Sequence, residues 1–78
     1  MRHAIAWSAV GDAAPPVEYV AHVGRWALSA ERVDSAMSPR AWRWGVDRGY
    51  RHAGGACRTA LGAQRCAVRE ARRLGMPA

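Results

Sequence analysis

Arginines dominate the C-terminal third of the chain, and their spacing points them in one direction. If residues 58–74 form a helix, at about 100° per residue, four later arginines fall within about 60° of Arg58. The four are Arg65, Arg69, Arg72 and Arg73. A guanidinium group binds phosphate or carboxylate oxygens through parallel hydrogen bonds. The pattern predicts a basic amphipathic helix over residues 55–75 whose outer face, Arg58 included, binds a polyanion.

A second group interleaves tryptophan with arginine. Trp42, Arg43 and Trp44 are consecutive, and further arginines flank them at positions 40, 48 and 51. Aromatic rings beside guanidinium groups suit base stacking combined with phosphate contact. The structural alternative places Trp42 in the core and leaves Trp44 as a half-exposed cover. The candidate nucleic-acid-binding residues of this group are Arg40, Arg43, Trp44, Arg48 and Arg51.

Residues 30–45 have the outline of a helix-turn-helix, in which the second helix enters the major groove of DNA. Ser38 and Pro39 suit the start of that second helix. Arg40 and Arg43 would then reach base edges or phosphates. Asp34 and the absence of a glycine in the turn depart from the usual pattern.

Other chemistry has little support in the sequence. The spacing of His22, His52, Cys57 and Cys66 matches no usual zinc pattern, and no nucleophile, acid–base pair or phosphate loop stands out. We therefore expect no enzyme activity, no cofactor and no metal. On one helix the two cysteines lie about half a turn out of phase, which predicts that they cannot form a disulfide with each other. We expect both to be reduced in a cytoplasmic protein.

The elements that must position these residues are predicted to be helical. Spacings of three and four predict helices over residues 17–28, 30–36 and 39–48, before the basic helix. Residues 1–14 are expected to form a strand or an extended arm, because no other strand is predicted to pair with it. The fold prediction is a mostly α single domain over residues 1–78, a small bundle of three to four short helices. Its predicted core is Val20, Val23, Trp26, Leu28, Val33, Trp42, Val46, Leu61 and Val68.

Composition bounds the possible functions. Of the 78 residues, 17 are alanine and only 11 are Val, Ile or Leu, so we expect a thin core. A partner, such as a second copy of the chain, is one way for such a core to become fully ordered. All twelve basic residues are arginine, as a high-GC genome would favour. Residues 40–78 carry nine arginines against Asp47 and Glu70, for a net +7, whereas residues 1–39 carry −1. No apolar run approaches the roughly 18 residues of a membrane span, so we expect no membrane association.

These observations favour a small nucleic-acid-binding protein, with DNA as the expected ligand, of the kind that mobile elements use as regulators. The alternative is a small adaptor or inhibitor that docks an Arg/Trp surface on an acidic protein partner. A translated reading frame without a selected function is the third possibility.

Overall fold

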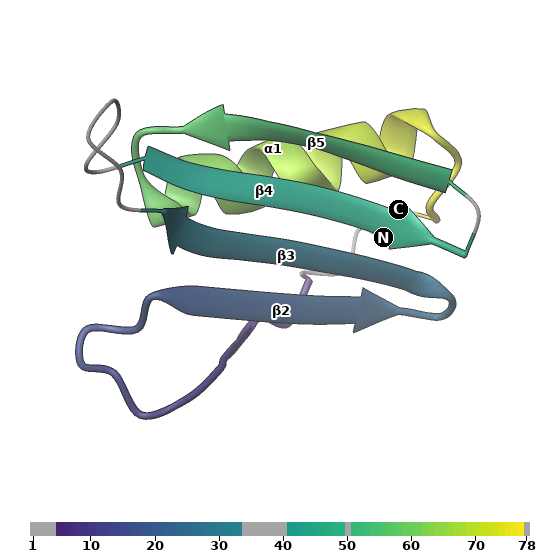
Figure 1. The fold of residues 1–78 in the computed structure, drawn as a ribbon. Coiled ribbons are helices and arrows are strands. Elements are labelled where there is room, and N and C mark those ends of the chain that lie inside the picture. Colours follow the sequence, from purple (N-terminus) through teal and green to yellow (C-terminus); the bar gives the residue numbers. More distant parts are fainter. Residues whose placement is uncertain (1–4, 34–40, 50, 78) are drawn as a thin grey trace.

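The protein is an antiparallel sheet covered on one face by a helix. The computed structural model describes residues 5–33, 41–49 and 51–77. The order of elements is β1 (Ser8–Ala9), β2 (Glu18–Val23), β3 (Trp26–Val33), β4 (Ala41–Arg48), β5 (Arg51–Cys57) and α1 (Ala60–Arg73). The strands lie in the sheet in the order of the sequence, so each strand pairs with its neighbours in the chain (Figure 1). The prediction of a mostly α helix bundle is therefore wrong.

The segment predicted as a helix over residues 17–28 is the hairpin of β2 and β3. Gly24 lies in the two-residue turn with φ +58°, in the left-handed region that glycine adopts without steric cost. Val23 is paired with Trp26 across the turn, and Ala21 is paired with Leu28. Gly24 marks a reversal of the chain here, whereas in the helix it would have been only an unfavourable residue.

The predicted helix over residues 39–48 is also wrong, because residues 41–48 form β4. Trp42, Trp44 and Val46 alternate with smaller or polar residues, which is the period of a strand. Their partners on β3 include Ala30 for Trp44 and Leu28 for Val46. Because a strand takes the place of the second helix of the motif, the helix-turn-helix prediction is wrong as well. The predicted helix over residues 30–36 begins inside β3, and residues 34–40 lie outside the described residues.

The N-terminal segment has a partner within the chain. Ser8 pairs with Val20 and Ala9 pairs with Tyr19, so β1 forms the edge of the sheet. Before β1, Ile5 and Trp7 pack against the core beside the helix. The prediction that this segment would find no partner in its own chain is wrong.

The C-terminal helix begins at Ala60, five residues later than predicted, because residues 55–57 belong to β5. The hydroxyl of Thr59 accepts a hydrogen bond from the amide of Gly62 at 3.0 Å and so caps the first turn. At the other end the amide of Gly75 donates to the carbonyl of Arg72, and the amide of Met76 donates to that of Ala71. These two bonds form a Schellman motif around Gly75, whose φ is +119°.

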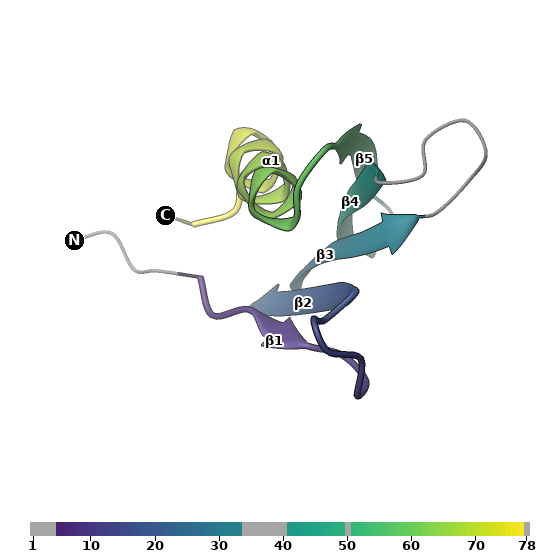
Figure 2. The ribbon, with the colours of Figure 1, turned by 90° about the vertical axis from the view of Figure 1, so that its left-hand side faces the viewer.

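A stripe of alanines holds α1 against the sheet. Ala63, Ala67 and Ala71 are fully buried, one turn apart, and α1 contacts β3, β4 and β5 (Figure 2). Alanine lets the helix backbone approach the strands closely, where Leu28 and Val46 face it.

The predicted core is right in part. Trp26, Leu28 and Val46 are buried, and Val23 and Val68 pack against them. Trp42 is half-buried, while Val20 and Val33 lie on the face of the sheet away from the helix. Leu61 is 55% exposed.

Substitutions at the alanine stripe test this packing. We expect Ala67→Leu to lower the free energy of unfolding by about 1–3 kcal/mol, because the added side chain overpacks the gap between helix and sheet. Leu61→Ala should change it by less than about 0.5 kcal/mol, because Leu61 is largely in solvent. Alanine and leucine have similar helix propensities, so urea denaturation of the two variants compares packing alone. Equal effects would contradict the buried position of Ala67.

Candidate nucleic-acid interface

The outer face of α1 is basic because the alanine stripe turns the opposite side of the helix to solvent. Arg65, Arg69 and Arg73 are exposed on it, and Arg58 is exposed just before the helix. Arg72 is half-buried. Residues 58–77 thus carry five arginines against Glu70, a net charge of +4. The described structure therefore brings together the five C-terminal arginines of the predicted site on one side of the molecule.

Contacts within the helix occupy some of these arginines and leave others available to an external anion. Nε of Arg73 donates to Oε2 of Glu70 at 3.0 Å, and Nη2 of Arg73 also contacts Oε1. Nη2 of Arg69 lies 3.8 Å from Sγ of Cys66. Arg58 and Arg65 make no ion pair with a carboxylate of the described residues. Arg58, Arg65 and Arg69 are therefore the cations best placed to meet an external anion.

The predicted site residues on β4 and β5 do not join this surface. Arg43 lies on the opposite face of the sheet, with Nη1 3.8 Å from Oε1 of Glu31. Trp44 faces the helix and packs against the core, so it offers no free ring for base stacking. The guanidinium of Arg48 lies 5.2 Å from the ring centre of Trp26 at the hairpin end of the sheet.

Two other predicted site residues cannot be placed as side chains. Arg40 lies outside the described residues, and only the backbone of Arg51 is described, at the start of β5.

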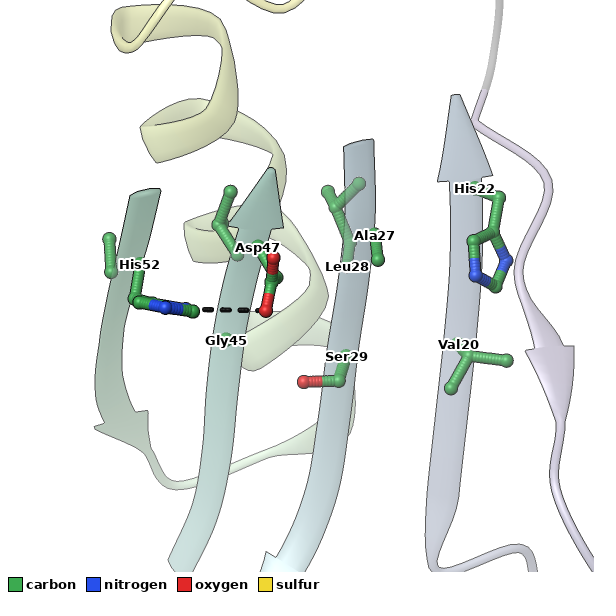
Figure 3. Close-up of a pocket in the computed structure, with 10 residues that line it drawn as sticks. Val20, His22, Ala27, Leu28, Ser29, Gly45, Asp47 and His52 are labelled. Atoms are coloured by element: carbon green, nitrogen blue, oxygen red, sulfur yellow. Dashed lines mark ion pairs between the residues drawn. The ribbon is translucent and has the colours of Figure 1, made fainter. Parts of the chain in front are cut away.

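The face of the sheet away from α1 carries mainly acidic and small residues. The strand register puts Glu18, Glu31 and Asp47 there together with Arg43. A shallow pocket of about 310 Å³ lies on this face between β2 and β5. In Figure 3, His52 and Asp47 point toward each other from neighbouring strands, with Nδ1 3.2 Å from Oδ2. The charges of this face make it unsuitable for a polyanion.

A pocket of about 500 Å³ adjoins the start of the basic helix. Tyr19 and Trp42 line it with their ring centres 6.0 Å apart, and Arg32 and Arg58 contribute cations. Thr59, the cap of α1, completes the wall. The sequence offered two interpretations of this region, a core position for Trp42 or aromatic rings that stack on bases beside arginines. Trp42 has features of both, since it is half-buried and also lines a pocket with arginines. Its partner Tyr19 had not been predicted as a site residue.

The two cysteines lie side by side, which corrects the prediction that one helix would hold them apart. Cys57 is the last residue of β5, Cys66 lies on α1, and their sulfurs are 3.2 Å apart. The chain reverses direction between them at Arg58 and Thr59, so the two cysteines do not share one helix. Both thiols are free and half-buried. Within the described residues no three His, Cys, Asp or Glu side chains are grouped to hold a metal ion.

Comparisons with protein-family models, curated proteins and solved structures give no match to this chain. In the part of the chain that the structure describes, no helix is long and apolar enough to cross a membrane.

The ion pair on α1 gives a pH prediction. The hydrogen bond from Arg73 lowers the pKa of Glu70 below its ordinary value of 4.5. The carboxylate is therefore favoured in the folded state, and its contribution to stability is present above that ordinary value and lost as pH falls through the lowered pKa. NMR titration of the Glu70 carboxyl carbon should show the lowered pKa, and Arg73→Gln should raise it. Arg43→Gln, on the other face, should leave it unchanged. A wild-type titration at or above 4.5 would contradict the contact.

Proposed function

We propose that the protein binds nucleic acid, DNA in the first instance, through the phosphate backbone on the outer face of α1. The observation that carries the proposal is the set of exposed arginines on one helix face, opposite the buried alanine stripe. Arg65 and Arg69 are one turn apart, about 6 Å along the helix axis. Duplex DNA carries one phosphate charge per roughly 1.7 Å of its axis, so several phosphates lie within reach of such a stripe.

The separation of charge supports this orientation. The helix side carries a net +4 over residues 58–77, whereas three of the carboxylates lie on the other face of the sheet. A polyanion is therefore attracted to one side and repelled by the other, which orients the encounter. An α-helix also fits the width of the major groove. Arg58 extends the surface toward the pocket of Tyr19 and Trp42, where an unpaired base has an aromatic contact.

An acidic protein partner is the competing reading of the same arginines. Of the tryptophans on this Arg/Trp surface, Trp44 packs against the core, while Trp42 lines the pocket beside Arg58. Capture from lysate with and without nuclease separates the two readings. Partners that depend on nucleic acid disappear after nuclease treatment, whereas an acidic protein bound directly stays. A regulatory role in a mobile element would further require preference for particular DNA sites.

The arginine stripe gives the test of the proposal. Replacing Arg65 and Arg69 with glutamine should weaken duplex DNA binding and reduce the log–log salt slope by roughly 2, because each phosphate contact contributes about 0.9. The loss should be similar for all sequences, since phosphates carry no base information. Fluorescence anisotropy over a range of salt concentrations measures the slope.

Arg43→Gln is the matched control because it removes an exposed arginine from the opposite face. It should leave the salt slope nearly unchanged, and circular dichroism should show that all variants remain folded. Wild-type protein that binds neither DNA nor RNA at about 50 mM salt would refute the proposal. An equal loss of slope in the Arg43 variant would refute the assignment to α1.

A further inference from the structure

The contact between Cys57 and Cys66 joins two elements that the chain brings together after a sharp reversal. Their sulfurs are 3.2 Å apart although nine positions separate the residues in sequence. A disulfide requires sulfurs at about 2.05 Å, so the pair has to close by roughly 1 Å, a distance that small side-chain rotations supply. The two sulfurs are therefore close enough for a bond to link β5 and α1.

Gly62 lies where the first turn of α1 packs against the end of β5. A side chain at position 62 would begin 3.6 Å from Cβ of Cys57 and 3.0 Å from the capping hydroxyl of Thr59. Cys66 follows Gly62 by one helical turn on the same side of α1. The first turn of the helix thus lies in contact with the end of β5, and the two thiols meet one turn later.

We propose that Cys57 and Cys66 form a reversible dithiol–disulfide pair that exchanges with small disulfides and fastens α1 to β5 when oxidised. Both cysteines are half-buried and so remain open to a small reagent. The proposal concerns a modification site and does not depend on the nucleic-acid-binding function.

The exchange balances with a small disulfide R–S–S–R as the oxidant. The thiolate of one cysteine attacks a sulfur of R–S–S–R, which forms a protein–S–S–R bond and releases one RS⁻. The second cysteine, as a thiolate, attacks the protein sulfur of that mixed disulfide and releases a second RS⁻. Two protein thiols are oxidised to one disulfide, the reagent is reduced to two thiols, and the two protons pass to the released thiolates or to solvent.

The surroundings of Cys57 act on its pKa in opposing directions. The hydrogen bond to Cys66 raises the pKa of the Cys57 thiol, burial raises it further, and the positive charge of Arg69 acts in the opposite direction. Arg69 also contacts Sγ of Cys66 directly. Arg69 therefore lies next to the sulfur of Cys66, and its charge favours the thiolate form of Cys57 that can start the exchange.

Peptide mapping tests the bond on the full chain. The native protein is incubated with bis(2-hydroxyethyl) disulfide, an uncharged reagent, then quenched with acid, alkylated and digested with trypsin. Cleavage after Arg51, Arg58, Arg65 and Arg69 separates the cysteines into peptides 52–58 and 66–69. We expect these two peptides linked by a disulfide, more completely than from protein treated in concentrated guanidinium, and released by dithiothreitol.

Three further readouts test the pair: the melting temperature, the single-cysteine variants and an Arg69 variant. Oxidation should raise the melting temperature by roughly 10 °C, because the bond restricts the unfolded chain. Cys57→Ser and Cys66→Ser should each stop at a stable adduct with the reagent. Arg69→Gln should slow the reaction several-fold, whereas Arg43→Gln, the control of equal charge, should not. Adducts on both wild-type cysteines without a linked peptide, or no reaction at either, would overturn the proposal.

Discussion

The contact between the alanine stripe of α1 and the strands is the constraint on which the other features depend. Ala63, Ala67 and Ala71 are small enough for the helix to lie close over Leu28 and Val46. This contact closes the core of a chain that has few large aliphatic residues. It also decides which side of the helix faces solvent, and hence where the arginines lie. The same docking brings the second turn of α1 to the end of β5, where the thiols meet.

The sequence predicts the C-terminal helix and its arginine face, but its patterns do not distinguish the strands from helices. A spacing of four suits both a helix and a strand, because four is also a multiple of two. The spacing of Trp42 and Val46 fits one face of a helix. Together with Trp44 between them, it equally fits the alternating face of a strand, which is what the structure shows. Gly24 would be an unfavourable residue in the predicted helix. In the structure it adopts the left-handed conformation and makes a turn. Gly24 and Gly49, both at positive φ, mark the tight reversals between β2 and β3 and between β4 and β5.

The candidate site could be derived only in part for a similar reason. The arginine stripe depends on one local period, so the sequence alone contains it. The hydrophobic pattern of the sequence points the inward face of the helix toward Leu61. Large apolar residues dominate such a pattern, whereas the alanines that are in fact buried contribute little to it. The segregation of Glu31 and Asp47 from the basic helix depends on strand register. The approach of Cys57 to Cys66 depends on the chain reversal between them, and no helical or strand period describes that contact.

The order of the strands has a consequence for how the protein folds. Each strand pairs with its neighbour in sequence, so the sheet has low contact order and its hairpins form from local encounters. The helix is the exception, because α1 must reach back to β3. The strands are therefore synthesised before the helix, and the apolar face of the sheet with Leu28 and Trp44 stays uncovered until α1 packs on it. That interval is when a nascent chain of this topology is most prone to aggregation and most in need of a chaperone.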